Sequence, residues 1–119
     1  MCSAHKEKAI TMQGLIKDIQ KISADFPMGL CLMTDGREIK IKPEKVVDGG
    51  VYFDINAVKE TLDIDYFEIV DVPSNKNLIL VCDEEGLLQE NPVLNFTATI
   101  LAKRQIVGNV MVCNTTRIR

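Results

Sequence analysis

The sequence has 119 residues, 46% of them hydrophobic and 26% charged, which is the balance of one globular domain rather than a disordered chain. The net charge is −3, and the 14 basic side chains are scattered among 17 acidic ones. Since general nucleic-acid affinity needs clustered lysine and arginine, we do not expect DNA or RNA as a partner. No apolar run approaches the roughly 18 residues of a membrane span, so we expect a cytoplasmic protein without membrane contact.

The N-terminal part of the chain predicts a tail and one helix. Residues 1–9 are polar and predict a flexible tail. Residues 10–24 predict an amphipathic helix, and we expect it to end near Asp25 because Pro27 disfavours helical backbone in the preceding residue. The apolar stripe of this helix consists of Met12, Leu15, Ile16, Ile19 and Ile22.

A β-hairpin is predicted next. Asp-Gly at positions 35–36 separates the strand-like runs 30–34 and 37–42, and this dipeptide suits a tight turn whose central residues have positive φ. In the second run Ile39 and Ile41 alternate with charged residues, so we expect the isoleucines to face inward and the lysines to face water.

Residues 44–50 predict a loop and residues 51–53 a short strand. Asp54 suits the N-cap of a short helix that ends near Asp63. We expect one face of this helix to be buried, formed by Ile55, Val58 and Leu62.

The segment Leu78–Cys82 is the one around which we expect the chain to be organised. Its five consecutive apolar residues predict a central strand that is buried on both faces. Residues 66–72 predict the strand before it, joined by a hairpin loop at 73–77. An acidic turn over residues 83–86 follows.

Two start positions compete for the last helix. Asn91 suits an N-cap with Pro92 in the first turn, whereas Asn95 suits the N-cap of a shorter helix over residues 96–103. We expect the buried side of this helix to be formed by Phe96, Ile100 and Leu101.

The end of the chain predicts a last strand over residues 106–113, in which Gly108 marks a bulge or a close backbone approach, and a polar tail at 114–119. The fold class is therefore α+β, with a mostly antiparallel sheet of about five strands and about three helices.

The cysteines have neither metal-ligand nor redox spacing. Cys31, Cys82 and Cys113 fall in apolar runs, where a free thiol behaves as a small hydrophobic group. The single histidine, His5, lies in the predicted tail beside Cys2. We therefore predict no metal site, no disulfide and no cofactor.

The one acidic cluster is formed by Asp83, Glu84 and Glu85. Adjacent carboxylates can bind a hard cation, but a hydrogen-bonded turn explains Asp83 and the glycine after the cluster without any ligand. No nucleophile elbow or phosphate-binding loop is present, so we predict no catalytic residue and no enzyme. The candidate binding residues are Asp83, Glu84, Glu85, Asn91 and Asn95.

Residues 79–88, followed by Pro92 and Asn95, and the later run 106–112 resemble a domain family of unknown function carried by bacteriophages, plasmids and other mobile elements. The family pattern is a D/N-E-E-G turn, a Pro-x-Asn start of a helix and a closing I-x-G-x-x-x-V strand. The resemblance spans residues 38–113 of one domain and leaves residues 10–36 as an N-terminal addition. It implies a mobile-element origin and supplies no catalytic residues.

Three functions remain open from the sequence. The first is a non-enzymatic protein-binding module of a mobile element, such as an inhibitor of a host defence system, with an unidentified protein partner. The second is a small-ligand or nucleotide binder that uses the loops of residues 83–95. The third is a metal-dependent hydrolase built on the acidic cluster. The sequence does not decide the oligomeric state, and a homodimer is one arrangement that it leaves open.

Overall fold

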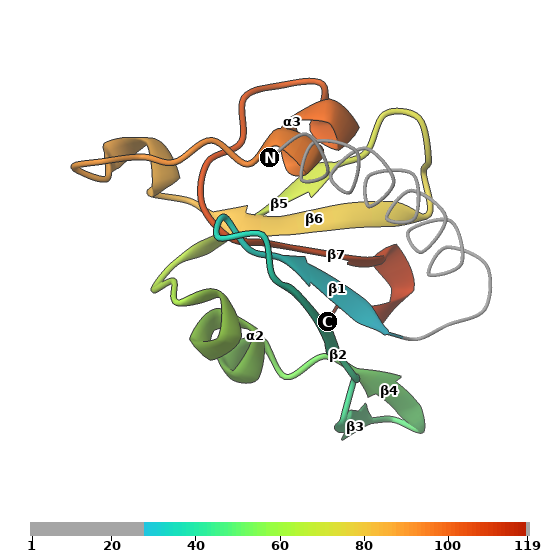
Figure 1. Cartoon of the computed structure of the whole chain (residues 1–119). Coiled ribbons are helices and arrows are strands. Elements are labelled where there is room, and N and C mark those ends of the chain that lie inside the picture. Colours follow the sequence, from blue (N-terminus) through green and yellow to red (C-terminus); the bar gives the residue numbers. More distant parts are fainter. Residues whose placement is uncertain (1–27, 119) are drawn as a thin grey trace, which may run out of the picture.

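The structure, a computed structural model, describes residues 28–118, so the predicted tail and the predicted helix over residues 10–24 lie outside the described residues. The described part is α+β, as predicted, with a five-stranded antiparallel sheet (Figure 1). In spatial order the strands are β2 (Glu38–Ile41), β1 (Gly29–Leu32), β7 (Val110–Asn114), β6 (Leu78–Asp83) and β5 (Phe67–Asp71).

Two of the three predicted α-helices fall within the described residues and are present there, and they pack on opposite faces of the sheet. Helix α2 (Ile55–Leu62) buries Val58 and Leu62 against one face. Helix α3 (Phe96–Ala102) buries two alanines against the other face. The sheet is therefore covered on both sides, which explains why β6 and β7 are apolar at every position except the last.

Strand β6 confirms the prediction of a segment buried on both faces. Leu78, Leu80 and Cys82 pack on the α3 side, whereas Ile79 and Val81 pack on the α2 side. The strand is interior, as predicted, because it lies between β7 and β5, but the middle position of the sheet belongs to β7. Strand order depends on pairing between distant segments, and a local apolar pattern carries no information about that pairing.

Both helices begin at the predicted caps. Asp54 Oδ1 accepts a hydrogen bond from the Asn56 backbone N–H at 3.0 Å. Asn95 Oδ1 accepts one from the Ala98 N–H at 3.2 Å, which decides between the two start positions in favour of Asn95 rather than Asn91. Each side chain satisfies one of the backbone donors that a helix N-terminus leaves free.

The predicted buried face of α3 is wrong for two of its three residues. Phe96 and Ile100 are 70% and 60% exposed, and Leu101 alone packs against the core. The buried residues of α3 are Ala98 and Ala102, which belong to the core on this face of the sheet. Both sides of this short helix carry apolar residues, and the small alanine side is the one that allows the helix to lie close to the sheet.

Two further segments differ from expectation. Part of the predicted loop at 44–50 is a strand, β3 (Lys45–Val47), which pairs with β4 (Gly50–Tyr52). The turn between them places Asp48 and Gly49 at positive φ, which suits a tight hairpin. The predicted polar tail forms a 3-10 turn, η2 (Thr115–Arg117), anchored by the hydrogen bond from the Phe53 N–H to the Arg117 carbonyl.

The last strand is shorter than the predicted 106–113, since β7 spans Val110–Asn114, and only Gly36 of the Asp-Gly turn has positive φ. The other local predictions agree with the structure. The hairpin at positions 35–36 joins β1 to β2, with Ile39 and Ile41 half-buried and their charged neighbours exposed. The loop at 73–77 joins β5 to β6. Three free cysteines are buried within the described residues: Cys31, Cys82 and Cys113. No helix between residues 28 and 118 has the length and apolar character to cross a membrane.

Candidate functional site

Most of the candidate binding residues lie on one projecting segment between β6 and α3. This segment, residues 84–92, is called the arm below, and Figure 1 shows it extending away from the end of the sheet. It contains the 3-10 helix η1 (Gly86–Leu88). The chain rejoins the body where the Gly108 N–H donates to the Val93 carbonyl and Leu94 bridges to Val107.

The base of the arm is a hydrogen-bonded turn. Asp83 Oδ1 accepts from the Glu85 N–H at 2.9 Å, and the Glu84 N–H donates to the Tyr66 carbonyl at 3.1 Å. Gly86 is needed here, because a Cβ at this position would lie 2.8 Å from a Val107 methyl group. The Asp83 carboxylate therefore stabilises the turn, as expected from the sequence.

The acidic cluster does not gather around one point. Asp83 is half-buried, whereas Glu84 and Glu85 are exposed. Within residues 28–118 no group of three or more histidine, cysteine, aspartate or glutamate side chains has an arrangement that could hold a metal ion. The geometry gives no support to a hydrolytic metal centre at this cluster.

Asn95 is a buried structural residue rather than a free binding group. It is only 5% exposed, and its Nδ2 donates both to the Leu32 carbonyl at 3.0 Å and to the Gly108 carbonyl at 2.9 Å. Since its Oδ1 caps α3, every polar atom of the side chain has a partner. Asn91, in contrast, is exposed on the arm.

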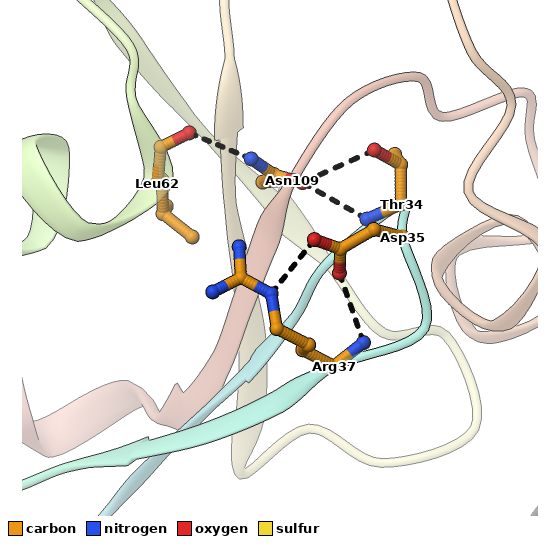
Figure 2. Close-up of polar contacts among 5 residues, drawn as sticks. All are labelled: Thr34, Asp35, Arg37, Leu62 and Asn109. Carbon is orange, nitrogen blue, oxygen red and sulfur yellow. Dashed lines mark hydrogen bonds and ion pairs between the residues drawn. The ribbon is translucent and has the colours of Figure 1, made fainter.

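A second asparagine, not identified from the sequence, makes the same kind of connection (Figure 2). Asn109 Oδ1 accepts from the Thr34 N–H at 2.9 Å, and Asn109 Nδ2 donates to the carbonyl of Leu62, the last residue of α2, at 3.0 Å. We call Asn95 and Asn109 the asparagine latch, because together they join β1, the start of β7 and both helices. The only signal for Asn109 in the sequence is that it follows Gly108. In the structure this glycine has a φ of +84°.

Figure 2 also shows the turn beside the latch. Asp35 accepts from the Arg37 backbone N–H at 3.0 Å and from Arg37 Nε at 2.7 Å. These two hydrogen bonds hold the pKa of Asp35 below its usual value, and the one from the backbone N–H makes the larger contribution. The turn that the sequence predicted from Asp-Gly is therefore also closed by an exposed ion pair.

A cavity of about 420 Å³ lies between the arm and the latch. Asp83 and Asn91 line it, whereas Glu84, Glu85 and Asn95 do not. Its charged lining residues, among those the structure describes, are all acidic: Asp63, Asp83 and Glu90. Such a lining suits a cation and opposes the phosphates of a nucleotide.

The 3-10 helix of the arm carries two residues that the sequence did not single out. Leu87 and Leu88 are 63% and 82% exposed, although the leucines of the sheet are almost completely buried. Exposed acidic residues flank them on both sides: Glu84, Glu85 and Glu90. A pair of leucines after a buried strand looks like further core in the sequence, so no local signal distinguished them.

The thiol nearest the arm is not activated. Burial raises the pKa of Cys82 to about 12, and the carboxylate of Glu68 adds to this shift. Burial likewise raises the pKa of Cys31 and Cys113 to about 12. A reactive cysteine is used as a thiolate, so these protonated side chains act as core residues.

Comparison with known proteins gives one match. The profile of a family described as Domain of unknown function (DUF3846) matches residues 32–118. Neither the curated proteins nor the solved structures compared with the chain gave a match. The matched range includes the resemblance expected over residues 38–113 and extends it at both ends. Because the match covers well over half of the sequence, the chain belongs to the DUF3846 family, a family of domains of unknown function.

Proposed function

We propose that this protein is a non-enzymatic protein-binding module that docks on its partner through the two exposed leucines of the arm. The observation that carries the proposal is the exposure of Leu87 and Leu88 on a projecting segment. Burying a leucine side chain stabilises a complex by about 1.5–3 kcal/mol. Because the fold leaves both leucines in water, a partner that buries them would gain this free energy on binding.

The charges around the leucines define the chemistry of the partner. Glu84, Glu85 and Glu90 are exposed beside them, and the whole chain is acidic. A complementary surface has an apolar pocket with lysine or arginine at its rim. Charges of this kind mainly accelerate association and select the partner, so the association rate falls as salt concentration rises.

The chemistry of the described side chains supports binding rather than catalysis. The buried thiols are held protonated, and the Asp83 carboxylate stabilises its own turn. The resemblance of residues 79–112 to domains of mobile elements supports a role in a bacteriophage or plasmid. An inhibitor of a host defence system fits this reading, because blocking a surface needs no catalytic group.

The test is affinity capture from a bacterial lysate with three forms of the protein. We expect a partner bound by the unmodified chain to be lost by Leu87→Ser/Leu88→Ser and kept by Val46→Ser. Val46 is a matched control because it is 70% exposed on β3, away from the arm. Equal capture by all three forms, or capture of nothing above background, would contradict the proposal.

The acidic cavity favours a second candidate, a small cationic ligand held between the arm and the latch. Asp63, Asp83 and Glu90 supply carboxylates to one hollow of about 420 Å³. A cation at about one hundred times its dissociation constant adds about 2.7 kcal/mol to the free energy of unfolding. A thermal-shift series with organic cations such as polyamines tests this, with divalent cations and nucleotides as comparisons and Asp63→Asn as the variant expected to lose the shift. No shift with any compound, or an equal shift in Asp63→Asn, would exclude the cavity as the site.

A further inference from the structure

A second hollow, of about 960 Å³, lies beside the outermost strand β2, near the N-terminal end of α2. The cavity described above lies at the opposite end of α2, so the two sites are separate. Helix α2 contacts β7 in the middle of the sheet, which leaves a groove between the helix and the edge of the sheet. The groove is lined by apolar side chains: Met28, Ile39, Ile41 and Ile55.

The edge of β2 offers backbone hydrogen-bonding groups to this groove. Strand β2 pairs with β1 and with no other strand of the described chain. The Met33 N–H donates to the Arg37 carbonyl at 3.0 Å, and Lys40 lies opposite Leu30 in the same register. Because hydrogen-bonded and non-hydrogen-bonded pairs alternate in an antiparallel ladder, the N–H and C=O of Lys40 point away from β1.

The side chains of β2 alternate between two chemical surfaces. Ile39 lies opposite Cys31, whose side chain packs on the α2 side of the sheet. Lys40 lies opposite Leu30, which packs on the α3 side. A strand added at this edge would therefore place every second residue beside the isoleucines and the intervening residues beside Lys40 and Lys42.

The charges at the groove select an acidic occupant. Its lining contains three lysines, Lys40, Lys42 and Lys45, against two carboxylates. One of these carboxylates, that of Asp54, already caps α2. The ion pairs formed within residues 28–118 are Arg37–Asp35 and Arg104–Glu68, so the three lysines have no acidic partner there. The edge of β2 is thus locally basic, with Lys40 and Lys42 on the face opposite Ile39 and Ile41, in a chain of net charge −3.

We propose that the groove between β2 and α2 binds an extended segment of a partner protein by strand addition, and that this segment alternates acidic and apolar residues. Its backbone hydrogen-bonds to the free edge at Lys40. Its apolar side chains contact Ile39, Ile41 and Ile55, and its carboxylates lie beside Lys40 and Lys42. Main-chain hydrogen bonds of this kind provide affinity, and the alternating side chains provide specificity. This site is independent of the arm and of the function proposed for it.

The probe is a fluorescein-labelled synthetic peptide of alternating glutamate and valine, about as long as β2, measured by anisotropy at low salt. We expect saturable binding, and at least about tenfold weaker binding when glutamate is replaced by lysine. N-methylation at alternate residues removes the backbone N–H groups along one edge of the extended peptide. A peptide methylated along the edge that faces β2 should lose binding to the unmodified protein. The same peptide methylated on the other edge should bind normally. Absence of saturable binding, or equal binding by all these peptides, would overturn the proposal.

Variants of the protein separate the backbone contact from the charge. Lys40→Pro removes the outward N–H and keeps the pairing with β1, since proline is tolerated where the strand N–H faces away from the ladder. We expect this variant to bind about tenfold more weakly than Lys40→Gln, which loses only the charge. Leu87→Ser/Leu88→Ser should bind the peptide like the unmodified chain. Equal affinity of Lys40→Pro and Lys40→Gln, or self-association of the unmodified chain that Lys40→Pro abolishes, would contradict a partner segment at this edge.

Discussion

Asn95 and Asn91 lie close together in the sequence, yet the fold uses them in opposite ways. Asn95 belongs to the asparagine latch, is buried, and has a hydrogen-bond partner for each polar atom of its side chain. Asn91 lies on the arm and is exposed. The same contrast holds for apolar residues, since Leu80 is buried in β6 while Leu88 is 82% exposed.

The difference shows where the molecule retains binding capacity. In the latch and the sheet, the interactions of polar and apolar groups are satisfied within the chain, and they contribute to the free energy of folding. On the arm, carboxylates and leucines remain in contact with water. A group that is already satisfied internally has little to offer a ligand, so the arm is the region from which function is expected.

The largest expected effect concerns the interior of the sheet. The pKa of three buried cysteines is about 12, against 9.0 for an ordinary thiol. A raised pKa in the folded state means that the stabilisation is complete below pH 9 and is lost as pH rises from 9 towards 12. At pH 10 we expect a loss of roughly 1 kcal/mol for each thiol, and several kcal/mol in total, measured by urea unfolding in the presence of a reductant.

A cysteine variant provides the control for this pH dependence. Cys113→Ala should be less stable at neutral pH because it leaves a small cavity. Its stability should also decrease less steeply above pH 9, by the contribution of one thiol. If its pH dependence is as steep as that of the unmodified chain, the buried thiols are not the cause.

A smaller effect is expected at Asn95 of the latch, and the same substitution at Asn91 of the arm provides the comparison. Asn95→Ala removes a helix cap and two hydrogen bonds to buried or half-buried carbonyls, so we expect a loss of about 3 kcal/mol. Asn91→Ala should change the free energy of unfolding by less than about 0.5 kcal/mol. Chemical unfolding followed by circular dichroism measures both. Similar losses at the two positions would remove the distinction between latch and arm.

The smallest effect on the free energy of unfolding is expected at Leu87 and Leu88 of the arm. Leu87→Ser/Leu88→Ser should alter stability by less than about 0.5 kcal/mol, because both side chains are already in water. Leu80→Ala, the same residue type in the core, should cost about 2–5 kcal/mol. Melting curves of the two variants make the comparison. A large loss from the arm variant would show that the leucines stabilise the fold and are not free for a partner.

The sequence was sufficient for features that depend on near neighbours. The Asp-Gly turn, the Asp54 cap and the buried run Leu78–Cys82 were all predicted at their observed positions. Each follows from the backbone preference or the apolarity of a few adjacent residues, which the surrounding fold does not change. The Asp83 turn was predictable for the same reason, because its hydrogen bond spans only two residues.

Only the tertiary structure decided how distant segments use their side chains. It placed β7 in the centre of the sheet, turned the alanine side of α3 inward, and recruited Asn109 as a connection between the hairpin turn and α2. It also left Leu87 and Leu88 in water. A side chain is buried or exposed according to what packs against it from elsewhere in the chain. That information lies in long-range pairing rather than in any local pattern of residues.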